Sequence, residues 1–261
     1  MKIGIIGLGW LGLPLAKSLL NKGFQVIGTT RSRSVGLSHE RFSHVLFDPL
    51  QKKQATAGYF NDLDVLILAF TPSKTDEKTY AKDCVRMLDL VSPSCKVIQL
   101  SSTGVYPERN GTFTEFDYPA GSIKTNSVGY AELAISSMLR DRLTVIRLSG
   151  LVGPNRYPAI AMSKSGKTYQ AFDRVNLIHR EDAIGLIEHV IVNKIWNKTI
   201  NGCATEHPLK GQFYTEMASR LGIDPPLFED KTRSERIISN NYSLEIGYRY
   251  IYPDPANFPI A

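Results

Sequence analysis

The first twelve residues constrain the fold more than any other stretch of the chain. A short apolar run, Ile3-Gly4-Ile5-Ile6, leads directly into Gly7-Leu8-Gly9-Trp10-Leu11-Gly12. The run is rich in β-branched residues, which is typical of a strand buried on both faces. Leu15 and Leu19 then recur one helical turn apart, and Gly23 supplies a C-terminal stop. The stretch therefore predicts a strand, a tight turn and a helix.

The three glycines have the G-x-G-x-x-G spacing of a dinucleotide-binding turn. Gly7 makes the tight turn, Gly9 lets the backbone approach a pyrophosphate, and Gly12 lets the helix pack closely on the strand. The backbone of Trp10 and Leu11, at the start of the helix, then faces the phosphates with N–H groups and a favourable dipole. We expect a dinucleotide site here; the alternative is an ordinary glycine-rich βα turn.

The end of the second expected strand, residues 24–29, indicates which dinucleotide binds. An NAD site usually places Asp or Glu at this point, to accept hydrogen bonds from the ribose hydroxyls. Here the next residues are Thr30-Arg31-Ser32-Arg33, and no carboxylate occurs before Glu40. Two guanidinium groups and two hydroxyls suit a 2′-phosphate. We predict NADP(H), with NAD(H) as the alternative; both arginines could also be solvated loop residues.

Length and composition allow either one large α/β domain or a domain with a lobe, and exclude several other classes of protein. The chain has 261 residues, 43% of them hydrophobic, and a net charge of +6. Its basic residues are scattered, without the aromatic interleaving of nucleic-acid sites, so we expect an anionic cofactor or substrate and no nucleic acid. The cysteines Cys84, Cys95 and Cys203 are odd in number and widely spaced. They fit neither a disulfide framework nor a zinc site, and we expect no metal.

The N-terminus predicts a cytoplasmic, reduced protein. The first strand begins at once, without a signal peptide, and no apolar stretch approaches the ~20 residues that span a bilayer. We therefore expect no membrane partner.

Strand and helix patterns alternate along most of the chain. Strands are expected at 45–47, 63–70, 96–100, 143–148 and 199–203, and helices at 80–91, 127–139, 181–192 and 209–221. This alternation predicts an α/β fold with a Rossmann-type doubly wound parallel sheet. Ligands of such sheets bind where strands end. Asp48 is therefore placed against an adenine ring, and Phe70, Thr71 and Ser101 along the cofactor, although Pro72 could mark only a turn.

The C-terminal region lacks the regular alternation of strand and helix patterns, and its composition predicts a small substrate lobe. It contains Asp224-Pro225-Pro226, a charged segment at 229–236, and residues 248–253, which are typical of an edge strand and tail. We expect residues 1–154 with 176–203 to form the dinucleotide-binding domain, and residues 155–175 with 204–261 to form the lobe.

Four segments in order resemble a known family: the glycine turn, Leu100-Ser101-Ser102-Thr103-Gly104-Val105-Tyr106, residues 147–154 and residues 176–182. The chain resembles the extended short-chain dehydrogenase/reductases called NAD-dependent epimerase/dehydratases, and looks closest to an atypical, shortened branch. The resemblance implies a Rossmann fold, NAD(P) binding, and oxidoreductase or epimerase-like chemistry on a small polar carbonyl or alcohol, such as a sugar derivative. It also implies helix pairing into a homodimer.

The family's chemistry uses a Ser or Thr hydroxyl, a Tyr phenol, and a Lys one helical turn after the Tyr. By resemblance Ser102, with Thr103, takes the hydroxyl position. Val128 stands where the Tyr belongs and Glu132 where the Lys belongs. Tyr130 is two positions away, about 200° around a helix, and is the remaining acid/base candidate. The rival hypothesis is a non-catalytic NADP(H)-binding sensor or interaction module.

Three further polar residues have a functional and a structural interpretation. His179 could titrate near a substrate, but before a helix it is more often a structural partner, here of Asp182. His207, in a Glu-His-Pro turn, is expected at the surface. Asp117 could contact substrate, or lie in a solvated acidic loop.

Overall fold

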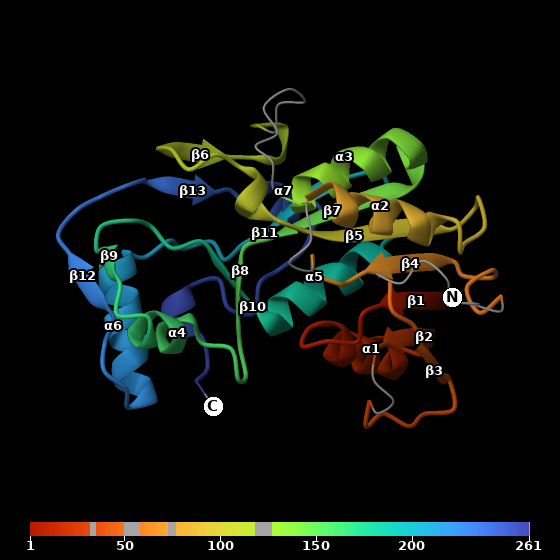
Figure 1. Cartoon of the computed structure of the whole chain (residues 1–261), viewed down its shortest axis with the longest axis horizontal. Helices are drawn as coiled ribbons and strands as arrows, with labels where there is room; N and C mark the ends of the chain where they lie inside the picture. Colours follow the sequence, from red (N-terminus) through yellow and green to blue (C-terminus); the bar gives the residue numbers. More distant parts are fainter. Residues whose placement is uncertain (32–34, 50–57, 73–76, 118–126, 261) are drawn as a thin grey trace. The chain divides into compact units, whose positions relative to one another are not determined.

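The computed structural model describes residues 1–31, 35–49, 58–72, 77–117 and 127–260. Its centre is a seven-stranded sheet in the order β11-β7-β5-β4-β1-β2-β3 (Figure 1). The strands are β1 (Lys2–Ile6), β2 (Gln25–Thr30), β3 (Phe42–Leu46), β4 (Val65–Leu68), β5 (Lys96–Ser102), β7 (Leu143–Leu148) and β11 (Thr199–Gly202). The pairings of β1 with β2 and β4, of β2 with β3, and of β4 with β5 are parallel. The predicted Rossmann-type sheet is confirmed.

Helices follow the strands as the hydrophobic periodicity predicts. They are α1 (Gly12–Asn21), α2 (Glu77–Leu88), α3 (Ser127–Leu139) and α5 (Arg180–Val192), with short 3₁₀ turns η1 (Thr103–Val105) and η3 (Arg140–Arg142). Helices α2 and α3 pack against each other, while α1 lies on the opposite face of the sheet (Figure 1). Cys84 and Met87 of α2 and Ile135 and Leu139 of α3 are buried in one core with strand residues such as Val97. This core fixes where the strand ends lie.

The strand order reverses direction between β1 and β4. The chain runs outward from β1 through β2 and β3 in one direction, and through β4 and β5 in the other. In an open α/β sheet the ligand binds at such a reversal, because the two diverging loops leave a gap between them. The glycine turn leaves β1 at this point.

The chain divides into two compact units. The first comprises the described residues within 1–105, 120–147 and 187–199; the second comprises those within 106–119, 148–186 and 200–261. The remaining elements belong to the second unit: β6 (Gly111–Phe113), η2 (Glu115–Asp117), β8 (Gly150–Val152), α4 (Pro158–Lys164), β9 (Thr168–Gln170), β10 (Leu177–His179), α6 (Lys210–Leu221), β12 (Leu227–Glu229), β13 (Arg236–Ile238), α7 (Asn241–Glu245) and η4 (Pro255–Asn257). Parallel pairs β8–β10, β9–β12 and β6–β13 build it.

Some sequence-based boundaries need correction. Residues 248–253 form no strand, because the N–H groups of Ile251 and Tyr252 donate to the Asp182 carboxylate, at 2.6 and 3.0 Å, and not to a neighbouring strand. The third strand lies three residues earlier than predicted at its start, at Phe42–Leu46. Its pairing with β2 begins opposite Val26 and so includes the polar Ser43 and His44, which the apolar pattern could not predict.

Candidate functional site

The glycine turn has two crowded glycines and one open glycine. Gly7 has φ of +107°, and a Cβ there would lie 3.0 Å from the Ala69 carbonyl oxygen. A Cβ on Gly12 would lie 2.1 Å from the Gly7 carbonyl oxygen. Gly9 is exposed, and a Cβ on it would meet nothing within 4 Å. Only Gly9 therefore leaves a bare stretch of backbone that a ligand can approach closely.

Thr29, at the end of β2, holds this turn in place. Its buried hydroxyl oxygen accepts the Gly7 N–H at 3.0 Å, and its carbonyl oxygen accepts the Leu8 N–H at 2.8 Å. Sequence reasoning named Thr30 and missed Thr29. The two threonines are adjacent and identical, so only the alternation of faces along β2 could have separated them.

The start of α1 suits an anion. Leu11 precedes the helix, no side chain caps that end, and the first turn carries no acidic residue. Trp10 and Leu11 are half-buried beside the exposed Gly9. With its positive dipole end uncompensated by a carboxylate, the helix presents a phosphate-binding N-terminus. These residues fit the diphosphate of a dinucleotide.

The end of β2 carries the residues predicted to select the dinucleotide. Thr30 is half-buried, and its Oγ1 lies 2.7 Å from Nε2 of His44 on β3. Arg31 is exposed. Ser32 and Arg33 lie outside the described residues. Asp48, predicted to meet the adenine, follows β3 and is half-buried.

Phe70 and Thr71 follow β4, and a Cβ on Gly7 of the glycine turn would lie 3.1 Å from the Phe70 nitrogen. The Phe70 carbonyl oxygen accepts the Tyr80 hydroxyl at 2.9 Å, and the two rings make an edge contact at 5.3 Å. Burial raises the pKa of Tyr80, so its phenol stays protonated and keeps donating. Thr71 is exposed. Tyr80 thus anchors the loop that follows β4.

A buried polar cluster joins β5, α3 and β7. Arg147 on β7 donates through Nη2 to Glu132 Oε2 at 2.8 Å, and through Nε to both carboxylate oxygens at 3.2 Å. Both side chains are almost fully buried, at 3% and 4% exposure. The Ser101 hydroxyl donates to Glu132 Oε1. Glu132, which the resemblance aligns with the family's Lys, is therefore neutralised by Arg147, and Ser101 uses its proton on Glu132.

Ser102 and Thr103 lie where β5 passes into η1. The half-buried Ser102 accepts the Gly104 N–H through Oγ at 3.1 Å, which leaves its hydroxyl proton for another acceptor. Thr103 is buried. Ser102 thus retains a donor, as a substrate-orienting hydroxyl requires.

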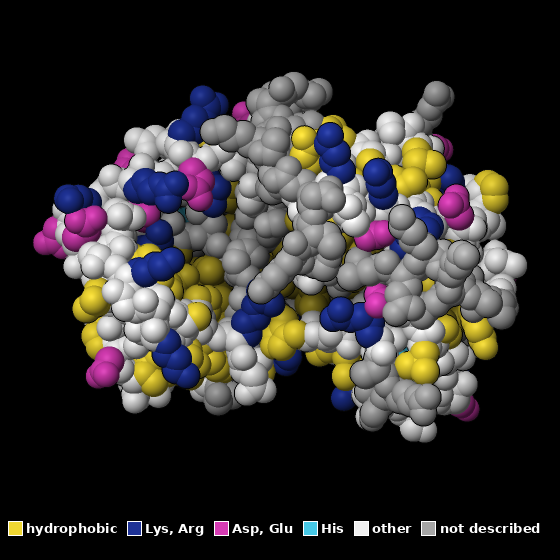
Figure 2. All heavy atoms as spheres, viewed as in Figure 1, with side chains coloured by type: hydrophobic (Ala, Val, Ile, Leu, Met, Phe, Trp, Pro, Cys, Tyr) yellow, Lys and Arg dark blue, Asp and Glu magenta, His cyan; other side chains and the backbone are white. Residues whose placement is uncertain are grey.

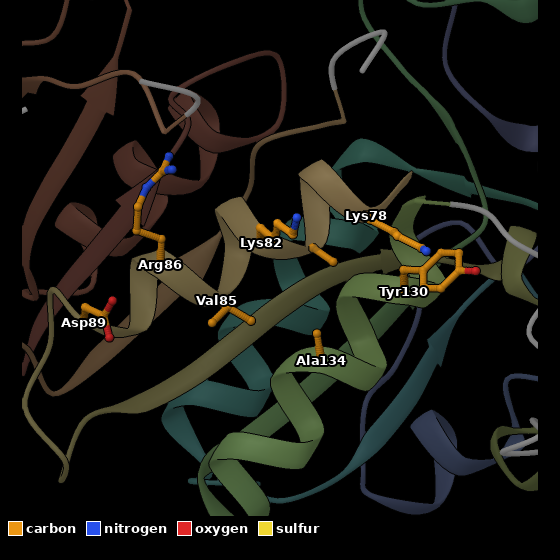
Figure 3. A pocket seen from close by; sticks show the side chains of 8 residues that line it. Lys78, Lys82, Val85, Arg86, Asp89, Tyr130 and Ala134 are labelled. Atoms are coloured by element: carbon orange, nitrogen blue, oxygen red, sulfur yellow. The ribbon is translucent and has the colours of Figure 1, made fainter. Parts of the chain in front are cut away.

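Tyr130 lines a groove between α2 and α3. The groove encloses ≈ 490 Å³ and is lined by Lys78, Ala81, Lys82, Val85, Arg86, Asp89, Tyr130 and Ala134. Figure 3 shows the Lys78 side chain extending toward the Tyr130 ring, while the Tyr130 hydroxyl points away from Lys82 and Arg86. Neither Ser102 nor Thr103 lines this groove.

The remaining candidates have structural roles. His179 is fully buried, with the Tyr252 and Phe258 rings at 4.5 and 5.4 Å, and burial lowers its pKa. His207 is half-buried, and not at the surface as predicted, because its Nδ1 lies 3.2 Å from the Val175 carbonyl oxygen.

Asp117 is exposed and binds residues of its own loop. Asp117 accepts the N–H and the hydroxyl of Thr114, both at 2.7 Å, and these bonds lower its pKa. It therefore caps its own loop. Within the described ranges, no three His, Cys, Asp or Glu side chains gather as metal ligands do.

Comparisons with known proteins agree with this geometry. Residues 2–109 match the family model for the NAD binding domain of 6-phosphogluconate dehydrogenase. Over 99% of both chains, the sequence is 32% identical to Protein YeeZ of Escherichia coli (strain K12). The chain belongs to the YeeZ family.

Solved structures show which fold this YeeZ relative has. The structure is similar to that of dTDP-glucose 4,6-dehydratase from Bacillus anthracis in complex with NAD, with a TM-score of 0.75 and 20% sequence identity. The match covers 97% of this chain and 92% of the dehydratase chain. It is also similar to the human epimerase family protein SDR39U1 with NADPH, with a TM-score of 0.73 and 15% identity over 98% of this chain and 97% of that chain. The resemblance to extended short-chain dehydrogenase/reductases is confirmed, and with it the NAD(P)-binding fold.

Proposed function

We propose that this chain is an NADP(H)-binding extended short-chain dehydrogenase/reductase that acts as an oxidoreductase or epimerase on a small polar carbonyl or alcohol, such as a sugar derivative. The observation that carries this proposal is the glycine turn. Gly7 and Gly12 have no room for a side chain, whereas the exposed Gly9 has room that only a ligand would use. Structural neighbours bound to NAD and to NADPH support the cofactor class.

The preference for the phosphorylated cofactor rests on the end of β2. Thr30 and the exposed Arg31 stand where an NAD site usually has a carboxylate. A guanidinium group pairs with a phosphate through charge-assisted hydrogen bonds, whereas a ribose hydroxyl gives it no charge partner. We expect Arg31 to contribute affinity only to NADP(H).

A calorimetric titration with NADPH, NADH and their oxidised forms tests both steps. The expected result is micromolar binding that favours the phosphorylated pair, with Arg31→Ala weakening NADPH roughly tenfold and NADH little. Lys17→Ala, which removes an exposed cation on α1, is the matched control. Absence of binding to all four dinucleotides would refute the proposal.

For the reaction, the bound dinucleotide would exchange hydride with a carbon of the substrate. Ser102 orients the substrate oxygen with the proton that its contact to Gly104 leaves available, and the buried Thr103 supports it. Tyr130 is the proposed acid/base, because it is the phenol two positions from the place of the family's Tyr. Ser102→Ala and Tyr130→Phe should each reduce turnover by 10²-fold or more, on the order of a lost general acid/base.

The second candidate is a protein that binds NADP(H) without turnover. The buried pair of Glu132 with Arg147 favours it, because the carboxylate occupies the position matched to the family's Lys and is committed to the sheet. A screen of carbonyl and alcohol substrates, followed by NADPH absorbance, separates the two. Substrate-dependent oxidation of NADPH that disappears in Ser102→Ala would rule out the binding-only function.

We also propose that α2 pairs with the same helix of a second copy of the chain. Lys78, Lys82 and Val85 lie on α2 and Asp89 directly follows it, in the 4-3-4 spacing of a helix-pairing seam. Two antiparallel copies related by an axis between residues 83 and 84 would set Lys78 opposite the partner's Asp89. Lys82 would then face the partner's Val85. The two Lys78–Asp89 pairs are therefore complementary in charge.

A charge swap tests this homodimer. By analytical ultracentrifugation, Asp89→Lys should shift the chain toward monomer, and the double variant Lys78→Asp/Asp89→Lys should restore the dimer. Asp224→Lys, at an exposed site in the second unit, is the control. A monomeric wild type, or no rescue, would refute the interface.

The remaining proposals concern partners and location. We propose that residues 155–175 with 204–261 form the lobe that selects a small-molecule substrate, in a cytoplasmic protein. Among the described residues, no helix is long and apolar enough to cross a membrane. Lys and Arg side chains lie in several separate places on the face in Figure 2 and do not gather in one track. Salt-sensitive retention on DNA would contradict this interpretation.

A further inference from the structure

One arginine of the second unit is half-buried and has a single hydrogen-bond partner. Arg236 begins β13, opposite Gly111 of β6 (Figure 1). Its Nη1 donates to the Tyr106 carbonyl oxygen at 3.3 Å, and within the part of the chain that the structure describes its guanidinium makes no other hydrogen bond and no ion pair. A guanidinium has five N–H donors in a planar fork. Most donors of Arg236 are therefore left for partners outside the protein.

The charges nearest to Arg236 leave one positive charge in excess. Burial lowers the pKa of Arg236, Glu108 raises it and Arg233 lowers it, so both side chains lie close enough to affect the guanidinium. Glu108 forms an ion pair with Arg233, and both side chains are more than half exposed. Two guanidinium groups thus share one carboxylate, which is engaged by the other arginine.

Cys203 also lies close enough to affect Arg236, but it supplies no compensating charge. Its side chain is fully buried, and burial raises the pKa of the thiol to about 12, so the thiol stays protonated at neutral pH. A half-buried cation without a counter-charge has lost part of its hydration. An anion that pairs with Arg236 would replace that lost stabilisation.

The segment that leads into β13 carries a second group without a full set of partners. The Ser234 N–H donates to Asp173 Oδ1 at 3.0 Å, but the Ser234 hydroxyl oxygen is buried and has no partner among the described residues. Buried hydroxyl groups are normally hydrogen-bonded. Two donors of this segment, two residues apart in the sequence, thus have hydrogen-bonding capacity that the described residues do not use.

We propose that Arg236 binds the carboxylate of the substrate. This inference rests on the proposed function, and it narrows the substrate to a carbonyl or alcohol that also carries a carboxylate. The planar guanidinium fork matches the two oxygens of a carboxylate. One excess positive charge is balanced by a monoanion, whereas a phosphate monoester near its dianionic form would leave negative charge uncompensated. Arg236 lies within residues 204–261, which belong to the segments proposed to select the substrate.

Thermal unfolding of the full chain in acetate tests the site without a dinucleotide. Relative to chloride at equal ionic strength, about 0.1 M acetate should raise the melting temperature of the wild type by a few degrees, as for millimolar affinity. Arg236→Met, which keeps most of the side-chain volume but no charge, should abolish this rise. Arg174→Met is the matched control, because the exposed Arg174 likewise donates to one backbone carbonyl oxygen, that of His207 at 3.1 Å. It should respond to acetate as the wild type does.

Stability in chloride separates a binding role of Arg236 from a structural role. Arg236→Met removes a half-buried charge together with one hydrogen bond, so it should be about as stable as the wild type. Arg236→Lys keeps the charge but not the fork, and its rise in acetate should be smaller than that of the wild type. A large loss of stability in both variants, or an acetate effect that persists in Arg236→Met, would overturn the carboxylate site. A rise with phosphate but none with acetate would overturn the class of anion.

The outcomes also separate this inference from the proposed function. If no dinucleotide binds, but acetate stabilises the wild type and not Arg236→Met, the proposed function fails and Arg236 stands as a carboxylate site. If NADPH binds, but acetate stabilises both proteins equally or neither, only the site is overturned. For a substrate that carries a carboxylate, Arg236→Met should raise KM about tenfold or more and change kcat little, as for a lost contact outside the reacting atoms. An unchanged KM would overturn the role of Arg236 in substrate binding.

Discussion

The glycine turn of the first unit and the C-terminal tail of the second are both irregular backbone, but the residues that hold them lie at different distances along the chain. The turn at Gly7 is held by Thr29, which lies 22 residues away on β2. Strand β2 pairs directly with β1, the strand that leads into the turn. The tail at 248–252 is held by the carboxylate of Asp182, which accepts the Tyr248 hydroxyl and the N–H groups of Ile251 and Tyr252. These partners are 66 to 70 residues from Asp182. One threonine of the adjacent strand, through its hydroxyl and its carbonyl oxygen, fixes the first region, and one carboxylate far away along the chain fixes the second.

Two buried carboxylates, one in each unit, differ in the groups that surround them. Glu132 in the first unit is paired with the Arg147 guanidinium. For Asp182, burial raises the pKa, although the N–H groups and Tyr248 act against that rise. Removing Glu132 takes the carboxylate away from a buried cation, whereas removing Asp182 takes the acceptor away from neutral donors. Since losing a buried counter-charge costs more than losing a neutral hydrogen-bond partner, the two losses should differ in size.

The largest effect is expected from Glu132→Ala, which leaves Arg147 buried without its carboxylate. Breaking a buried pair from one side costs about 3–5 kcal/mol of unfolding free energy. Urea denaturation measures it, and Glu229→Ala, which breaks the exposed 2.7 Å pair with Lys231, is the control and should change little. Equal losses in the two variants would show that burial of the Glu132 pair does not matter.

Asp182→Ala should follow, at about 3 kcal/mol, because several buried donors lose one acceptor together. Asp182→Asn keeps one carbonyl oxygen and should lose less. Protease cleavage within residues 248–261 should accompany the alanine variant, since the tail loses its clamp. A tail that stays protected in Asp182→Ala would show that the rings of Tyr252 and Phe258 against His179 suffice to hold it.

These two regions also explain what the sequence could predict. The turn was predictable because each glycine answers a local steric demand, such as the 2.1 Å approach of a Gly12 Cβ to the Gly7 carbonyl. The α3 helix, Ser127–Leu139, has the predicted bounds because its apolar spacing is local as well. The tail was mistaken for a strand because its alternating tyrosines fit that pattern. The actual partner of the tail is Asp182, in the first turn of α5. Acidic residues are common at that position, so the sequence did not indicate that Asp182 binds a distant segment.

The candidate site divides in the same manner. Gly7, Gly9 and Gly12 came from spacing, whereas the role of Thr29 and the contact of Thr30 with His44 depend on the register between β1, β2 and β3, which no local pattern encodes. The pairing of Ser101 with Glu132 joins two elements 31 residues apart. Resemblance could align Glu132 with a family position, but only packing showed that Arg147 neutralises it.

A third experiment separates crowding from openness within the glycine turn. Gly12→Ala should lower the unfolding free energy by about 1–3 kcal/mol, because its Cβ forces the helix away from the Gly7 carbonyl. Gly9→Ala should leave stability nearly unchanged and weaken NADPH binding, since its methyl group fills space that belongs to the ligand. Calorimetry and thermal unfolding of both variants measure these effects. Loss of stability in Gly9→Ala would mean that the open space is not needed for a ligand.

The smallest effect is a difference in pH dependence between Asp173 and Asp182. Burial opposes ionisation of Asp173, but Lys210 at 2.7 Å and the N–H groups of Ser234 and Arg233 outweigh it, so its pKa is lowered on folding. Its contribution to stability is therefore present above the unfolded value of about 3.9 and is lost as the pH falls through the lower folded value. The pKa of Asp182 is raised on folding, so the folded state takes up that proton first.

Stability should accordingly respond to acid with opposite signs at the two positions. As the pH falls from neutral, the stability of the wild type relative to Asp173→Asn should shrink, whereas its stability relative to Asp182→Asn should grow between the unfolded and the raised folded pKa. Urea denaturation of the three proteins at several pH values from neutral to acid measures both slopes. Slopes of the same sign would mean that the donors around Asp182 outweigh its burial. The tail would then be held by a charged carboxylate, as Lys210 and the backbone hold Asp173, and the contrast between the two kinds of clamp would reduce to the presence of a cation.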